Sequence, residues 1–136
     1  MASNLAFLLE DEEIDRIVLE NRLNEVGLIP VTYNNVEDAK NQFNKTGDIY
    51  VAYFLDMQVP VLKGETPVHK AGLELRDCLI GKNVNPNKIF LMSGVVSYQD
   101  EIVAKEYAFS SNKIIGKGQF TEQFLRELLE KQKIKF

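Results

Sequence analysis

The sequence is poor in the residue types that build many common active sites. Its 136 residues include one cysteine, Cys78, one histidine, His69, and no tryptophan. A single cysteine cannot form an internal disulfide, which favours a reducing compartment such as the cytoplasm. A single histidine has no second histidine with which to share a metal ion. Metal centres and catalytic sites built mainly on histidine or cysteine are therefore not expected.

Basic charge and long hydrophobic runs are also scarce. The 16 Lys and Arg residues are outnumbered by 20 Asp and Glu residues, which gives a net charge of −4, whereas DNA-binding domains are usually basic. No apolar run approaches the about 20 residues of a membrane span. Glu10 and Asp11 interrupt the apolar stretch that a signal peptide would need. We expect one cytoplasmic domain, over residues 1–136, that binds neither DNA nor membrane.

The stretch Val-Ala-Tyr-Phe-Leu-Asp-Met-Gln-Val-Pro, residues 51–60, organises the chain. Its apolar first half is typical of a strand buried on both faces of a parallel sheet. Asp56 then follows, and Pro60 ends regular structure. Aspartate is common in ordinary turns. At the end of a central parallel strand, however, it lies where open α/β sheets bind their ligands.

Apolar and amphipathic segments alternate along the whole sequence. The pattern predicts strands over residues 5–9, 28–33, 49–55, 89–92 and 113–115. It predicts helices over residues 12–26, between Asn35 and Gly47, over 72–79 and 98–109, and from 121 onward. This alternation indicates an α/β fold with right-handed crossovers and a parallel sheet covered on both faces. Pro30 places the second strand at an edge of that sheet, because proline cannot donate a ladder hydrogen bond.

Polar residues follow four of the five predicted strands. They are Glu10 and Asp11, then Asp56, Ser93 and Lys117. The carboxyl ends of parallel strands share one edge, so these side chains should converge. Three neighbouring carboxylates repel one another, and one would take up a proton unless a cation neutralised them. Mg²⁺ suits such a site because it binds a few carboxylates and keeps waters. A carboxylate can attack phosphorus to form an acyl phosphate, whose oxygens a lysine and a hydroxyl can contact.

This ordered set resembles the receiver domain of bacterial two-component response regulators. The matching segments are residues 8–12, 56–60, 72–75 and 93–94, together with Lys117, and the resemblance extends over residues 4–131. It implies a flavodoxin-like, doubly wound five-stranded parallel sheet in the order 2-1-3-4-5, with five helices. It also implies a stand-alone receiver that acts as a phosphoacceptor rather than as an enzyme, beyond weak self-phosphorylation and autodephosphorylation.

The resemblance also implies roles for individual residues. Asp56 is the phosphoacceptor, and Ser93 and Lys117 contact the phosphoryl group. Mg²⁺ is held by Glu10, Asp11, Asp56 and the main-chain carbonyl of Gln58. The implied partners are a sensor histidine kinase or a histidine phosphotransfer protein, and a downstream protein that the sequence does not identify.

The sequence departs from the family pattern in three places. Gly118 follows the lysine where proline is usual, and Ile114 replaces an aromatic residue that usually rotates on activation. The spacing of residues 72–75 also implies an insertion of about eight residues around 65–71, next to the site. The usual signalling motion is therefore not expected of this chain.

Three other functions are open to such a sequence. A receiver-like scaffold that binds proteins without phosphorylation is compatible with Ile114 and Gly118. A haloacid-dehalogenase-like phosphohydrolase needs a second aspartate two residues after the first, and Gln58 stands there. A flavodoxin must accept a flavin phosphate in its first loop, which four successive acidic residues, 10–13, disfavour.

Overall fold

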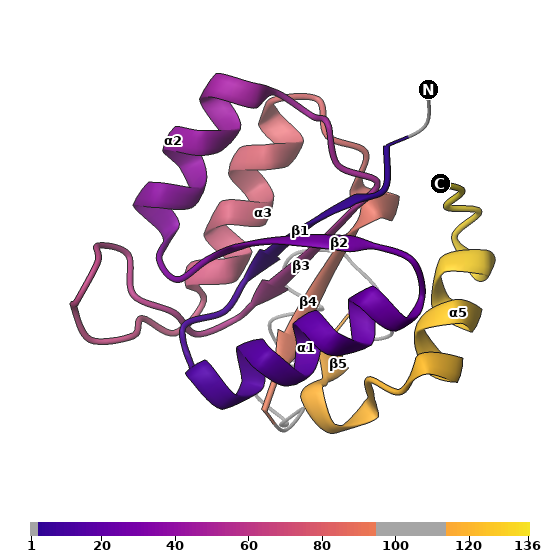
Figure 1. The fold of residues 1–136 in the computed structure, drawn as a ribbon. Coiled ribbons are helices and arrows are strands. Elements are labelled where there is room, and N and C mark those ends of the chain that lie inside the picture. Colours follow the sequence, from indigo (N-terminus) through magenta and orange to yellow (C-terminus); the bar gives the residue numbers. More distant parts are fainter. Residues whose placement is uncertain (1–2, 95–113) are drawn as a thin grey trace.

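In the computed structural model, residues 3–94 and 114–136 are described. Five parallel strands form one sheet in the order β2-β1-β3-β4-β5, so the predicted doubly wound order is confirmed (Figure 1). The strands are β1 (Leu5–Leu9), β2 (Ile29–Tyr33), β3 (Ala52–Asp56), β4 (Ile89–Ser93) and β5 (Ile114–Gly116).

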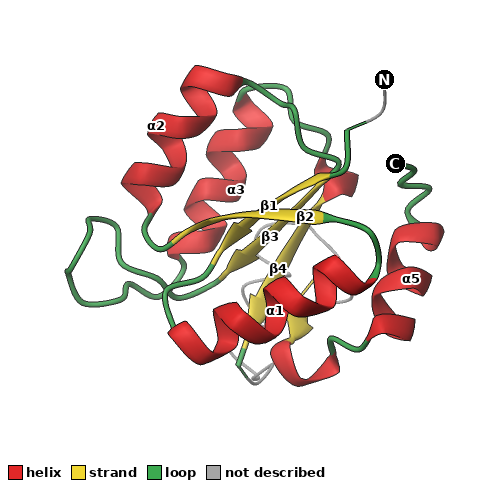
Figure 2. Cartoon of the chain, in the orientation of Figure 1, coloured by secondary structure: helices red, strands yellow, loops and turns green. Residues whose placement is uncertain are grey.

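Helices cover both faces of this sheet. They are α1 (Glu13–Glu25), α2 (Val36–Thr46), α3 (Ala71–Gly81) and α5 (Glu122–Lys131). Helices α2 and α3 lie on one face, and α1 and α5 lie on the other (Figures 1 and 2). Short 3-10 helices precede β4, at Pro86–Lys88, and follow β5, at Lys117–Gln119. The helix expected over residues 98–109 lies outside the described residues.

Two of the helices begin at residues whose side chains cap the helix N-terminus. Asn35 caps α2 by accepting a hydrogen bond from the Asp38 N–H at 2.8 Å. Thr121 caps α5 by accepting from the Phe124 N–H at 3.1 Å. Gly47 ends α2 with a φ of 70°, a conformation that glycine adopts without steric cost.

Strand residues alternate between two hydrophobic cores. The side chains packed under α2 and α3 include Phe7, Leu9, Tyr53, Leu55 and Leu91. Those packed under α1 and α5 include Ala6, Leu8, Phe54, Phe90 and Met92. Because both faces are covered, β1, β3 and β4 are apolar almost throughout, as expected for parallel strands.

The register of the sheet brings the strand ends together. Leu9 of β1 pairs with Leu55 of β3, so the chain leaves both strands at the same level, at Glu10 and Asp56. Pro30 lies on the edge strand β2, as predicted, opposite Ala6. No helix within residues 3–94 and 114–136 combines the length and the hydrophobicity that crossing a bilayer requires.

Two expectations about apolar residues were wrong. In the helix predicted over residues 12–26, the spacing places Val18 on the same apolar side as Leu19, Leu23 and Val26. In the structure Val18 is 45% exposed, because α1 packs on the sheet through Leu19 and Leu23. Strand β3 begins at Ala52 rather than at residue 49. Ile49 is largely exposed, in a turn where its N–H donates to the Gly47 carbonyl.

The segment between β3 and α3 forms an ordered, projecting loop (Figure 1). Val59 and Val68 form an antiparallel bridge at its base. The carbonyls of Pro60 and Val61 accept hydrogen bonds from the first N–H groups of α2, at 3.1 and 2.9 Å. The expected insertion extended to Ala71, but this residue is fully buried as the first residue of α3, so the loop ends before it.

Gly72, in the first turn of α3, lies directly against the backbone of Asp56. A Cβ atom at this position would be 2.0 Å from the Asp56 carbonyl oxygen. The Gly72 N–H also donates to the Met57 carbonyl at 3.2 Å. The start of α3 and the end of β3 are thus in backbone contact, which only glycine permits.

We expect Gly72→Ala to lower the free energy of unfolding by about 1–3 kcal/mol, because the new methyl group forces the two backbones apart. Gly81→Ala, at the end of the same helix, is the matched control, since a Cβ there meets nothing within 4 Å. The control should be neutral or slightly stabilising. Urea unfolding measures both variants, and equal effects would contradict the close-contact explanation.

Candidate functional site

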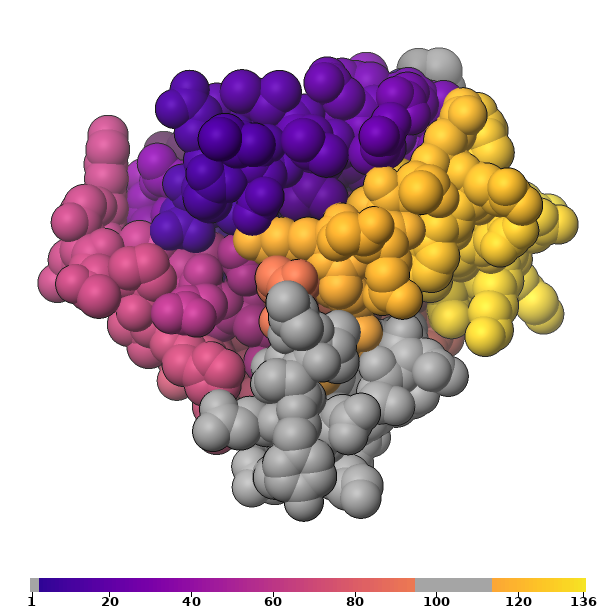
Figure 3. Space-filling view, turned by 90° about the horizontal axis from the view of Figure 1, so that it is seen from below, coloured from indigo at the N-terminus to yellow at the C-terminus, as the bar shows by residue number. Residues whose placement is uncertain are grey.

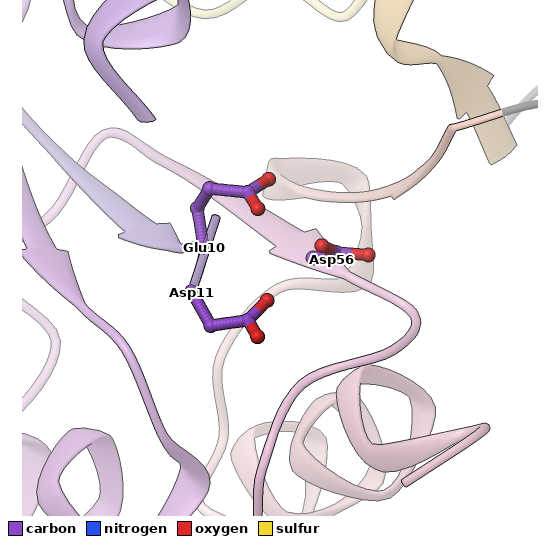
Figure 4. A group of neighbouring side chains, drawn as sticks. All are labelled: Glu10, Asp11 and Asp56. Carbon is purple, nitrogen blue, oxygen red and sulfur yellow. The ribbon is translucent and has the colours of Figure 1, made fainter. Parts of the chain in front are cut away.

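Three carboxylates converge at the carboxyl edge of the sheet. Glu10 and Asp11 follow β1, Asp56 ends β3, and their side chains point toward one another (Figure 4). One oxygen from each lies within 4.8 Å of the others. Glu10 is fully buried and Asp56 is 5% exposed. The convergence predicted from the strand ends is therefore present for these residues.

Lys117 joins this cluster from the segment after β5. Its Nζ atom lies 2.8 Å from Asp56 Oδ2 and 2.8 Å from Glu10 Oε2. It also lies 3.1 Å from Asp15 Oδ2, on the first turn of α1. Figure 3 shows this edge of the molecule, where the start of α1, the loop after β3 and the segment after β5 adjoin.

The sequence reasoning missed Asp15. Its side chain reaches the site because Asp15 lies in the first turn of α1, which begins just after Glu10 and Asp11 at the end of β1. The Glu12 carboxylate caps that turn and accepts from the Asp15 N–H at 2.7 Å. The position of Asp15 in the first turn after the acidic pair could have indicated it, but acidic residues in a first helical turn usually have a simpler explanation in the helix dipole.

Ser93 and Gln58 also lie at this edge. Ser93 is the last residue of β4 and pairs with Gly116, the residue before Lys117. The Gln58 N–H donates a hydrogen bond to Asp56 Oδ1 at 3.1 Å. The two oxygens of Asp56 are thus held separately, one by a main-chain N–H and the other by the Lys117 ammonium.

Burial and mutual repulsion shape the protonation of the cluster. Burial, together with the charge of Asp56, raises the pKa of Glu10 to about 7, despite the opposing effect of Lys117. Burial also raises the pKa of Asp11. Burial alone would lower the pKa of Lys117, but its close contacts with the carboxylates of Asp56 and Glu10 outweigh this and raise the pKa.

The donor set fits a hard divalent cation. Glu10 Oε1 accepts from the Glu12 N–H at 3.1 Å. Glu10 Oε2 is buried and has an ion-pair contact with Lys117, but no partner in hydrogen-bond geometry among the described residues. Glu10, Asp11 and Asp56 together carry more negative charge than Lys117 neutralises, and a cation would neutralise the excess. Carboxylate oxygens are ligands that suit Mg²⁺.

The raised pKa of Glu10 predicts a pH dependence of stability without divalent cations. A carboxyl group whose folded pKa lies above its unfolded value stabilises the fold while protonated, and this contribution is lost as pH rises. The free energy of unfolding should therefore fall between about pH 5 and pH 8, by at most about 3 kcal/mol. Urea unfolding with a chelator present measures this fall.

Glu10→Gln should remove most of that pH dependence, because the amide does not titrate. Asp11, whose pKa is also raised, accounts for part of what is left. A Glu10→Gln variant with the full pH dependence of the parent would show that another group causes it.

No family model and no curated protein matches this sequence. Solved structures do match its fold. Chemotaxis protein CheY4 of Vibrio cholerae is 14% identical with a TM-score of 0.70, and the match covers 96% of this chain and 98% of that one.

Two further solved structures were determined with magnesium. The receiver domain of a sensor histidine kinase from Pseudomonas aeruginosa, with a magnesium ion in its active site cleft, is 16% identical, with a TM-score of 0.68 and coverages of 96% and 98%. Response regulator TrrA of Thermotoga maritima, in complex with Mg²⁺-BeF, is 23% identical, with a TM-score of 0.67 and coverages of 95% and 98%. The chain thus has the fold of response regulator receiver domains over nearly its whole length.

Proposed function

We propose that the chain is a phosphoacceptor signalling protein of a two-component system or phosphorelay, and that Asp56 receives the phosphoryl group. One observation carries the proposal. Asp56 ends the central strand with one oxygen 2.8 Å from the Lys117 ammonium, beside the buried carboxylate of Glu10 and the carboxylate of Asp11. This arrangement presents a nucleophilic oxygen and a cation to one incoming phosphoryl group.

The transfer makes one bond and breaks one. An oxygen of Asp56 attacks phosphorus while the bond from phosphorus to the donor breaks. That bond is to oxygen in acetyl phosphate and to a ring nitrogen in phosphohistidine. Its electron pair remains with the leaving acetate or imidazole, and the imidazole takes up a proton. The product is an aspartyl phosphate, with three acceptor oxygens that need charged or polar partners.

The surrounding residues supply those partners. In this proposal Glu10, Asp11, Asp56 and the main-chain carbonyl of Gln58 hold Mg²⁺, which neutralises charge on a phosphoryl oxygen when bound. The Lys117 ammonium contacts a second oxygen, and the Ser93 hydroxyl contacts a third. The Gln58 N–H already orients the acceptor carboxylate at 3.1 Å.

The donor would be a sensor histidine kinase or a histidine phosphotransfer protein in the cytoplasm, and the signal would pass to a downstream protein by docking or further phosphotransfer. The loop after β3 is a candidate surface for selecting these partners. It projects beside the site and exposes Val61, Leu62 and Val68, and apolar side chains of this kind are available for protein contacts.

Incubation with acetyl phosphate and Mg²⁺ should add the mass of one phosphoryl group to the intact protein. Asp56→Asn should abolish this gain, because the amide is not a competent nucleophile toward phosphorus. Asp77→Asn is the matched control, since Asp77 is a half-exposed aspartate on α3 away from the cluster, and it should be labelled like the parent. Intact-mass spectrometry with and without a chelator measures all three proteins.

Labelling of the Asp56→Asn variant to the level of the parent would refute the assignment. Failure of the parent itself would favour the alternative, a receiver-like scaffold that works without phosphate. One observation favours that alternative. Ile114, which is buried in β5, offers no aromatic ring that could rotate on phosphorylation.

A further inference from the structure

The ammonium group of Lys117 is in close contact with three carboxylates. Asp56, Glu10 and Asp15 contact its Nζ atom at 2.8, 2.8 and 3.1 Å. An ammonium carries three donors. Two of these donors make hydrogen bonds to Asp56 and Asp15, and the Glu10 carboxylate lies beside the nitrogen as an ion-pair partner. A phosphoryl oxygen that approaches Lys117 therefore competes with these carboxylates for the ammonium.

The three carboxylates differ in the cost of losing contact with Lys117. The side chains of Glu10 and Asp56 are 0% and 7% exposed, whereas that of Asp15 is 42% exposed. A buried carboxylate without its cation is costly, but an exposed one exchanges the cation for water at little cost. Asp15 is consequently the partner that a phosphoryl oxygen would replace.

Asp15 also places negative charge close to the phosphorylation site. Its Oδ2 and that of Asp56 contact the same nitrogen, at 3.1 and 2.8 Å, so they are at most about 6 Å apart. A phosphoryl group on Asp56 adds a charge of roughly −1.5 to −2. Repulsion between this group and Asp15 opposes the phosphorylated state in addition to the competition for Lys117.

We propose that Asp15 is a positioning residue that holds Lys117 in the unphosphorylated protein and competes with the phosphoryl group for its ammonium. The proposal rests on Asp56 being the phosphoacceptor. Asp15 then sets how readily the site accepts a phosphoryl group. Asp15 lies on α1 and is not among the carboxylates that we propose hold Mg²⁺, namely Glu10, Asp11 and Asp56.

The test is the affinity for beryllofluoride, a phosphoryl mimic, at saturating Mg²⁺. Asp15→Asn should bind it about three- to fivefold more tightly than the parent, the size expected from removing one partly exposed charge pair. Asp15→Glu, which keeps the charge, should stay near the parent. The shift of the Gly72 amide, beside Asp56, follows binding by NMR.

Glu13→Gln is the matched control, because Glu13 lies in the same helical turn and has the same charge, but has no ion pair with Lys117 in the described part of the chain. Its affinity should stay within about twofold of the parent, because exposed charges without a close partner contribute little. Equal tightening in Glu13→Gln and Asp15→Asn would overturn the proposal in favour of a general charge effect.

The remaining outcomes also distinguish between the proposed role of Asp15 and the proposed role of Asp56. If the parent binds beryllofluoride and Asp15→Asn binds it equally or more weakly, Asp15 has no competing role, and the phosphoacceptor assignment stands alone. A parent that binds none overturns both. Urea unfolding of Asp15→Asn separates a structural role, because a purely structural residue would lower stability without tightening the mimic.

Discussion

The ion pairs of Lys117 with Glu10 and Asp56 are the interaction on which the site depends. Two carboxylates that are almost fully buried lie at the end of a hydrophobic sheet, where charge is costly unless a partner compensates it. A single ammonium, 2.8 Å from each, provides that compensation. Because one cation serves two buried anions and a third exposed one, the cluster keeps an excess of negative charge. That excess explains both the raised pKa of Glu10 and the fit to a divalent cation.

The rest of the fold holds these groups in place. Parallel pairing aligns the ends of β1 and β3, and the two hydrophobic cores fix the sheet from both faces. Gly72 lets the start of α3 lie against the backbone of Asp56. Lys117 reaches the cluster from the segment after β5, two strands away from β3. The cluster is therefore buried at Asp56 and more open where Asp15 faces solvent.

The competition proposed for Lys117 would connect this geometry with the proposed signalling role. If phosphorylation of Asp56 displaces the exposed Asp15 rather than a buried partner, the change begins at the first turn of α1. This turn adjoins both the loop after β3 and the segment after β5 (Figure 3). Ile114 has no ring to rotate, so a route through the first turn of α1 would not need the aromatic residue that the family usually has. The projecting loop, hydrogen-bonded to the start of α2, lies on the same edge.

The sequence by itself determined the alternation of strands and helices, the edge position of β2 through Pro30, and the convergence of Glu10, Asp11, Asp56 and Lys117. These features follow from local rules. The spacing of apolar residues, the missing N–H of proline and the shared edge at the carboxyl ends of parallel strands can be used without knowing how distant segments pack. The sequence did not reveal that Val18 is exposed or that Asp15 contacts Lys117. Both depend on the rotation of α1 against the sheet, which is decided by packing between segments distant in sequence. Asp15 and Lys117, for example, are separated by 102 positions. The requirement for Gly72 likewise appeared only in the tertiary structure, because it arises from contact between the backbones of α3 and β3.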